Sequence, residues 1–166
     1  MIIRRETAAD IAAITDVTVA AFRNQPFSHQ TEQFIVNALR MANALAVSLV
    51  AEVDGQVVGH IAFSRVTVSD GTRDWYGLGP VSVLPAYQRR GIGKTLIQEG
   101  LSSLRALGTS GCALVGDPSY YARFGFRNSP GLVYEGVPQE FFLVLPFGGE
   151  IPRGVVVFHD AFLATG

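Results

Sequence analysis

Hydrophobic and polar residues alternate along the chain with two different periods, and each change of period predicts a new element. Residues 2–5 show the two-residue alternation of a short strand. Residues 11–22 place apolar side chains three and four positions apart, which predicts a helix that Thr7 caps. A second helix, capped by Thr31, is predicted next from the same spacing. The chain is therefore expected to begin with a strand and two helices.

The middle of the chain carries strand patterns joined by tight turns. Residues 46–53 and 57–68 are rich in apolar and β-branched residues and flank Asp54-Gly55, a dipeptide typical of hairpin turns. A further turn at Asp70-Gly71 extends this hairpin into an antiparallel meander.

The second half of the chain predicts one crossover and two closing strands. The crossover consists of a strand at 79–83, a helix at 92–108 and a strand at 112–115. Residues 141–145 and 155–158 are predicted to form a closing pair of strands. No repeat or low-complexity linker interrupts the pattern, and 166 residues lie within the size of one domain. We therefore expect a single domain over residues 1–166.

A glycine-containing loop joins the strand at 79–83 to the helix that follows it. Its sequence is Gln88-Arg89-Arg90-Gly91-Ile92-Gly93-Lys94. The first N–H groups of a helix have no intrahelical partner and lie at the positive end of the helix dipole, where a phosphate accepts hydrogen bonds from them. Two arginines and the only lysine of the chain add positive charge. The loop is therefore predicted to bind phosphate.

Spacing excludes two other phosphate-binding motifs in this loop. A P-loop needs glycine at position 88, which is Gln88. The dinucleotide-binding fingerprint needs a glycine or alanine at position 96, which is Leu96. The pattern that remains is Q-x-x-G-x-G at a junction between a strand and a helix.

A second motif follows the strand at 112–115. Asp117 and Pro118 predict the start of a short helix, with Asp as the N-cap and Pro in the first turn. Gly125 supplies the left-handed residue that ends this helix. Tyr121 lies four residues before Gly125, and we assign its neighbour Tyr120 to packing.

Together the two motifs, Q-x-x-G-x-G and then Y-x-x-x-G-F, resemble those of the GNAT superfamily of N-acetyltransferases. The run Asp-Pro-x-Tyr-Tyr-x-x-Phe-Gly-Phe is similar to the small bacterial YhbS-like branch. This resemblance implies an α/β (α+β) fold with a central mixed, mostly antiparallel sheet, helices on both faces, and a splayed pair of fourth and fifth strands. It also implies transfer of an acetyl group from acetyl-CoA to a primary amine, of a small molecule or a protein, within a ternary complex.

The resemblance also implies the roles of site residues. A backbone N–H of the fourth strand polarises the acetyl carbonyl, and since Pro80 cannot donate, this role falls to Val81. The amides of Val81 and Val83 would pair with the pantetheine arm as an added strand does. The pyrophosphate would lie on Gln88, Arg89, Arg90, Gly91, Ile92, Gly93 and Lys94. Tyr121 would act as general acid for the departing thiolate.

The general base is left open. Family members often carry a Glu on the fourth strand or its neighbour, but residues 75–84 contain no acidic residue. His60, Asp74, Glu52 and ordered water are the candidates. His60 lies in a strand that should neighbour the fourth and has a suitable ordinary pKa, but no carboxylate is evidently placed to orient it. The missing acid also leaves an alternative function, a non-catalytic acyl-CoA-binding module or sensor.

The acceptor is not specified by any motif. Residues 22–41 correspond to the segment that forms the acceptor lid in the family. Within it Phe27, His29 and Gln30 suggest a polar and aromatic pocket. We therefore predict an amine acceptor without naming it.

Composition narrows the class of partner. The formal net charge is -1 and the arginines form no stripe, which argues against nucleic acid, and no apolar run reaches the roughly 18 residues of a membrane helix. A single cysteine, Cys112, and no secretory signal favour a cytoplasmic protein without an internal disulfide. The histidines at 29, 60 and 159 lack metal-ligand spacing, so we expect no metal. Apolar residues reach 48%, which makes a homodimer conceivable.

Overall fold

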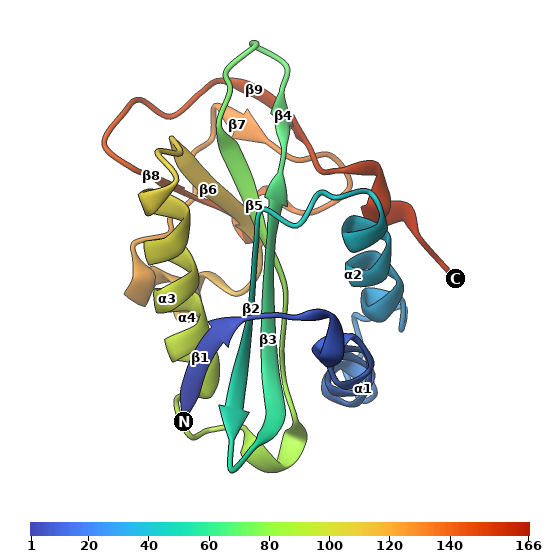
Figure 1. Cartoon of the computed structure of the whole chain (residues 1–166). Helices are drawn as coiled ribbons and strands as arrows, with labels where there is room; N and C mark the ends of the chain where they lie inside the picture. The colour runs from blue at the N-terminus through green and yellow to red at the C-terminus, as the bar shows by residue number, and fades with distance from the viewer.

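A six-stranded sheet forms the centre of the protein in a computed structural model that describes residues 1–166 (Figure 1). Its strands, in order across the sheet, are β1 (Ile2–Arg5), β2 (Val47–Val53), β3 (Gln56–Arg65), β5 (Trp75–Val83), β6 (Gly111–Val115) and β8 (Phe142–Pro146). Only β5 and β6 run parallel, and every other neighbouring pair is antiparallel. The predicted mixed, mostly antiparallel sheet is therefore confirmed.

Helices cover both faces of this sheet, as predicted. The helices α1 (Ile11–Phe22) and α2 (Glu32–Met41) lie on one side, and α3 (Ile92–Ala106) lies on the other (Figure 1). Thr31 is the N-cap of α2. Thr7 caps a 3-10 turn that leads into α1, and its amide donates to Asp10 Oδ2 over 2.7 Å. Thr31 therefore marks the start of α2 as predicted, whereas Thr7 caps the 3-10 turn and Asp10 is the N-cap of α1 itself.

A small three-stranded sheet corrects the predicted closing pair. It contains β4 (Thr67–Val68), β9 (Gly154–Val157) and β7 (Leu132–Val133). The segments expected to pair with each other separate, because β8 pairs with β6 in the main sheet and β9 pairs with β4 and β7. Burial explains why the two segments join different sheets. β8 is buried on both faces, as a strand within the main sheet must be, whereas β9 buries only Val156.

The β5 and β6 strands separate after three residue pairs. Their pairing runs from Trp75 opposite Gly111 to Gly77 opposite Ala113, and no pair follows. On its other side β5 has a bulge, since Ile61 of β3 lies opposite Val81 while Phe63 lies opposite Leu78. The splayed pair and the irregularity at Gly79-Pro80 are both confirmed, and they leave one edge of β5 without a neighbouring strand.

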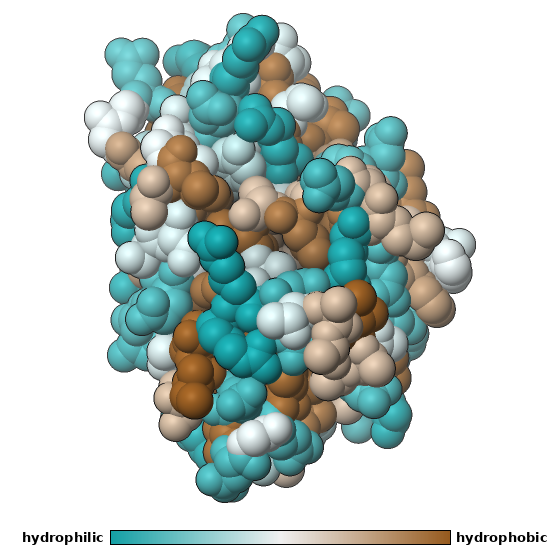
Figure 2. All heavy atoms as spheres, in the orientation of Figure 1, coloured by the Kyte–Doolittle hydropathy of each residue, from teal (hydrophilic) through white to brown (hydrophobic).

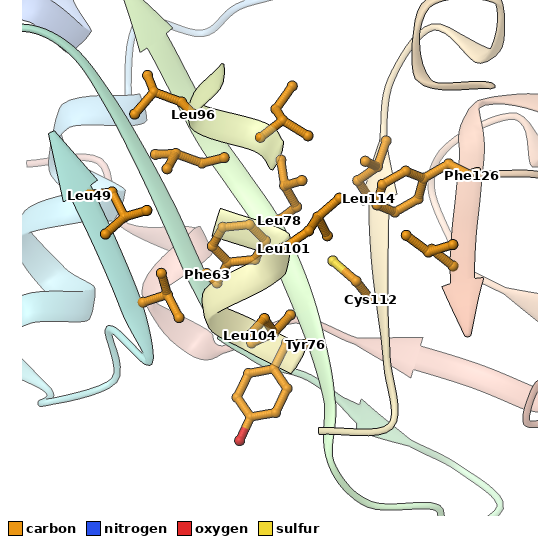
Figure 3. Close-up of a cluster of buried hydrophobic side chains, with 14 of the residues drawn as sticks. Leu49, Phe63, Tyr76, Leu78, Leu96, Leu101, Leu104, Cys112, Leu114 and Phe126 are labelled. Atoms are coloured by element: carbon orange, nitrogen blue, oxygen red, sulfur yellow. The ribbon is translucent and has the colours of Figure 1, made fainter. Parts of the chain in front are cut away.

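The main core lies between α3 and the sheet. Leu96, Leu101 and Leu104 of α3 face Phe63 and Leu78 of the sheet (Figure 3). Gly100 has a packing role that its sequence position did not reveal, because a Cβ there would overlap the Phe63 ring. Cys112 is fully buried in this core, and burial raises the pKa of its thiol above the ordinary range. It therefore behaves as a small hydrophobic residue.

The remaining surface is mixed in character. On the face seen in Figure 2, hydrophilic and hydrophobic residues are interspersed, and no hydrophobic area extends across it. None of the helices combines the length and hydrophobicity that crossing a membrane requires. The predicted homodimer stays a prediction.

Candidate active site

A cavity of about 530 Å³ opens beside the free edge of β5. It lies between that edge, the start of α3, the end of α1 and the short helix α4 (Pro118–Tyr121). Most of the predicted site residues line it together: Val81, Val83, Gln88, Arg89, Gly91, Ile92, Gly93, Lys94 and Tyr121. Two do not, Arg90 and His60.

The loop before α3 exposes a run of free amide groups. A 3-10 turn at Pro85–Tyr87 ends β5, and α3 begins at Ile92 with Gly91 as its N-cap. After this turn, Thr95 is the first residue whose backbone N–H donates to a backbone carbonyl, that of Gly91. The amides of residues 89–94 donate to no protein group. They are therefore available to an anion at the positive end of α3.

The two glycines of the loop have different roles. Gly91 has a φ of 82°, a left-handed conformation that favours glycine. Gly93 is helical, and a Cβ built on it would meet only the Val83 side chain, at 3.7 Å. Neither backbone strain nor packing within the protein explains a glycine at 93. A bound group that approaches the backbone closely would explain it.

Charge in this cavity has one sign. Its only charged side chains are Arg89, Lys94 and Arg123, and no acidic residue lines it. Arg90 instead lies with its guanidinium over the Tyr87 ring, 5.1 Å from the ring centre. The cavity is therefore electropositive, as an anionic ligand requires.

The free edge of β5 presents backbone groups to the same cavity. The N–H of Leu84 donates to the Val58 carbonyl of β3, at 2.9 Å. Because successive N–H groups of a strand point to alternate sides, the amides of Val81 and Val83 point away from β3, toward the side where β6 has separated. The side-chain amide of Gln88 donates to the Val83 carbonyl at 3.0 Å and so fastens the loop to this edge.

Tyr121 lies on α4, where local signals act as the sequence predicts. Asp117 caps this helix by accepting from the Ser119 amide at 2.9 Å, and Gly125 ends the following turn with a φ of 93°. The Tyr121 ring packs against Tyr120 and Phe126, with ring centres 5.0 and 6.0 Å away. Burial raises the pKa of Tyr121 to about 12. Its phenol is therefore protonated at neutral pH.

Several lining residues were missed or assigned otherwise from sequence. Tyr120, assigned to packing, also lines the cavity, with the Arg123 guanidinium 4.5 Å from its ring centre. Of the three residues expected in the lid, Phe27 lines the cavity, whereas His29 does not and Gln30 uses its side-chain amide to bond the Phe22 carbonyl. In the sequence, the only indication that Tyr120 lines the cavity is that it directly precedes Tyr121.

His60 lies outside the cavity in a polar cluster of its own. Its ring is fully buried, with Nε2 2.8 Å from Ser48 Oγ and 3.7 Å from Glu6 Oε1. The carboxylate that seemed absent from the sequence is thus Glu6, which also accepts from Arg40 Nε at 2.7 Å. Burial would raise the pKa of Glu6, but the hydrogen bonds from Arg40 and Ser48, together with the nearby His60 ring, outweigh it and hold that pKa well below its usual range.

Burial lowers the pKa of His60, because it disfavours the positively charged form of the ring. The ring is therefore neutral near pH 7. Two other candidate bases, Glu52 and Asp74, also lie outside the cavity. Glu52 accepts from Arg4 at 3.0 Å, and Asp74 lies 3.5 Å from Arg65. No group of three His, Cys, Asp or Glu side chains is placed to hold a metal ion.

The chain is similar to known acetyltransferases over most of its length. Residues 11–126 match the model of the Acetyltransferase (GNAT) family. The uncharacterized N-acetyltransferase YhbS of Escherichia coli K12 is 37% identical over 128 residues, which is 76% of this chain and 74% of that protein. The phosphinothricin N-acetyltransferase of Streptomyces viridochromogenes is 35% identical over 125 residues, 70% of this chain and 66% of that enzyme.

Two solved structures share the fold at substantial identity. A GNAT family acetyltransferase from Brucella melitensis in complex with acetyl-CoA is 52% identical, with a TM-score of 0.87 and 97% of each chain covered. E. coli YhbS in complex with CoA is 31% identical, with a TM-score of 0.84, covering 99% of this chain and 93% of that one.

Proposed function

The chain belongs to the GNAT family of acetyltransferases, and on that premise we propose that it transfers an acetyl group from acetyl-CoA to a primary amine. The observation that carries the proposal is the run of free amides at residues 89–94, which opens into an electropositive cavity beside the free edge of β5. Similar proteins were crystallised with acetyl-CoA or CoA, which supports the same ligand here. We assign the whole chain, residues 1–166, to one catalytic domain.

The two halves of the cavity suit the two halves of acetyl-CoA. The loop amides and the side chains of Arg89 and Lys94 would hold the pyrophosphate by charge-assisted hydrogen bonds. The amides of Val81 and Val83 would pair with the amide groups of the pantetheine arm, much as an additional strand would. This binding mode uses only groups that the protein leaves without partners.

The chemistry requires little from side chains. The amine nitrogen bonds to the thioester carbonyl carbon, and we assign the Val81 N–H to the oxygen that becomes negative in this step. As the carbon–sulfur bond breaks, the nitrogen loses one proton and the sulfur gains one. We assign the second transfer to Tyr121, whose pKa of about 12 keeps the phenol protonated at neutral pH.

One observation favours a second candidate, a non-catalytic acyl-CoA-binding module. No acidic side chain lines the cavity, so no carboxylate there takes the proton of the amine. A binder would bind acetyl-CoA equally well, but no amine would accelerate thiol release from it. Tyr121 favours the enzyme, because a protein that only binds acetyl-CoA has no need of a proton donor in this cavity.

The substitution Tyr121→Phe tests the proposal. It removes the phenol and keeps the ring that packs against Phe126, so CoA affinity should be retained. Amine-dependent thiol release should fall by roughly a hundredfold, the scale of a lost general acid. Tyr120→Phe is the matched variant, because it removes a hydroxyl from the same cavity and should keep most of the turnover.

Thiol release is followed with a disulfide reagent, and CoA affinity by titration calorimetry. Equal turnover in the parent and in Tyr121→Phe would remove Tyr121 from the mechanism. Failure of every amine to accelerate thiol release, with CoA binding intact, would favour the binding module.

A further inference from the structure

A second cavity, of about 230 Å³, lies next to the first one. Both contact Phe22, at the end of α1, and both border β5: the first at Val81 and the second at Leu78, Gly79 and Pro80. The second cavity also reaches Val115, the last residue of β6. It therefore opens at the point where β5 and β6 part, one residue from the amide assigned to the acetyl carbonyl.

Aromatic rings form much of its wall. Tyr134 and Phe158 lie with ring centres 5.0 Å apart, and Phe158 and Phe162 5.1 Å apart. All three line the cavity together with Phe22. Val115 is 45% exposed at the end of a strand whose other residues are buried, so its apolar side chain lacks a partner here. Such a wall favours an apolar, ring-sized group.

Glu32 is the only charged residue that lines this cavity. It is the first residue of α2, and its Oε1 accepts a hydrogen bond from Ser28 Oγ at 2.6 Å. No basic side chain of the cavity neutralises it, and Oε2 has no partner within the protein. A carboxylate beside aromatic rings is suited to a cation, because the negative ring faces attract it as well.

We infer that this second cavity receives the acceptor, that the acceptor is a primary amine with an aromatic body, and that Glu32 binds its amino group. The inference rests on the proposed acetyl transfer and adds the substrate class to it. Glu32 also supplies the carboxylate that β5 lacks. It would hold the amine as an ammonium ion beside Gly79-Pro80, which adjoin Val81, and the ammonium would lose one proton to solvent before its nitrogen attacks the thioester carbon.

Size and charge favour this class over other amines. An apolar cavity of about 150 Å³ accommodates benzene in another protein, so about 230 Å³ leaves room for a ring and a short alkylamine. A diamine needs a second carboxylate, and a peptide needs polar partners for its backbone. The side chains of the wall supply neither, because apart from Glu32 and the Tyr134 hydroxyl they are apolar.

Binding of an unreactive probe tests the inference without relying on turnover. Phenethyltrimethylammonium carries the ring and the cation but has no N–H to acetylate. Titrated into the protein saturated with CoA, it should bind at least about tenfold more tightly than choline, which lacks the ring. Glu32→Gln keeps an acceptor for Ser28 and should weaken the probe about fivefold. Glu99→Gln removes a charge from the exposed face of α3 and should bind as the parent does.

Turnover supplies the second measurement. Phenethylamine should have a higher kcat/KM than putrescine or a lysine peptide with a blocked N-terminus. Glu32→Gln should raise the KM for phenethylamine about fivefold and leave the KM for acetyl-CoA unchanged. Glu32→Asp, which keeps the charge, should recover part of the loss.

The results separate this inference from the proposed function. If Glu32→Gln binds the probe as Glu99→Gln does, or if putrescine or the peptide is the better acceptor, the inference is wrong while acetyl transfer stands. If the parent fails to bind CoA, or no amine accelerates thiol release, the proposed function is wrong and the inference falls with it.

Discussion

A negative side chain at Gly93 should abolish CoA binding while leaving the protein folded. Gly93 is a better site for this change than Gly91, because Gly91 has a left-handed backbone that any side chain would strain. At Gly93 a Cβ meets only Val83, at 3.7 Å, so we expect Gly93→Glu to fold. Its carboxylate would occupy the space into which the free amides of residues 89–94 point.

The expected magnitude follows from the hydrogen bonds at risk. A charge-assisted hydrogen bond contributes about 1.5 to 3 kcal/mol, and the new side chain would remove at least two of them from a phosphate. The loss is therefore about 3 kcal/mol or more, which weakens CoA binding by at least roughly a hundredfold. Repulsion between the new carboxylate and the phosphate adds to it.

Titration calorimetry with CoA measures the effect, and thermal unfolding shows whether each variant folds. Gly149→Glu is the matched control: Gly149 lies in an exposed loop, has no atom near a built Cβ, and lies outside the cavity. If folded Gly93→Glu binds CoA with the affinity of Gly149→Glu, the loop is not the phosphate site.

Two predictions concern pH. His60 is buried outside the cavity, so the rate should rise with pH toward the pKa of the amine, in the parent and in His60→Gln alike, when two amines of different pKa are compared. Burial lowers the pKa of His60, so a rise of the rate that stays at or below about pH 6.5 with both amines and is lost on substitution would restore His60 as the base. The hydrogen bond from Arg4 lowers the pKa of Asp10 to about 2, so this carboxylate stabilises the fold above its unfolded pKa of about 4, and the contribution is lost as pH falls toward 2. In Asp10→Asn, the free energy of unfolding, measured with urea at a series of pH values, should change less between about pH 4 and pH 2. An unchanged pH dependence would contradict this role of Asp10.

Local signals predicted the glycine-containing loop at the start of α3 and the ends of several helices. Asp117 and Gly125 act within a few residues of their own positions, and Thr31 directly precedes α2, so the sequence around these three residues is sufficient. The bulge at Gly79-Pro80 belongs to the same class, because proline cannot contribute an N–H to a strand ladder wherever the strand lies. Resemblance to a family then supplied the mostly antiparallel sheet, the helices on both faces and the splayed pair of strands.

Contacts between distant segments could not be predicted in this way. Glu6 reaches His60 because β1 and β3 both pair with β2, and Arg40 reaches Glu6 from α2. None of these residues has a motif around it. The prediction that β8 and β9 pair with each other was wrong for the same reason. Both segments have strand patterns, but burial across the whole fold determines which strands they pair with.

The two cavities give a physical reason why no acidic residue is needed on β5. A carboxylate at Val81 or Val83 would lie in the cavity where we propose that Arg89, Lys94 and the loop amides bind the phosphates, and it would weaken that binding. Glu32 lies instead across the bulge, in a cavity without basic residues, where a negative charge attracts an ammonium group. Positive charge thus lies on one side of the bulge in β5, at Arg89 and Lys94, and negative charge lies on the other, at Glu32. On the proposed function, this arrangement would bring an anionic donor and a cationic acceptor together at the parting of β5 and β6, and the proton of the amine would leave toward solvent beside Glu32 rather than toward the buried His60.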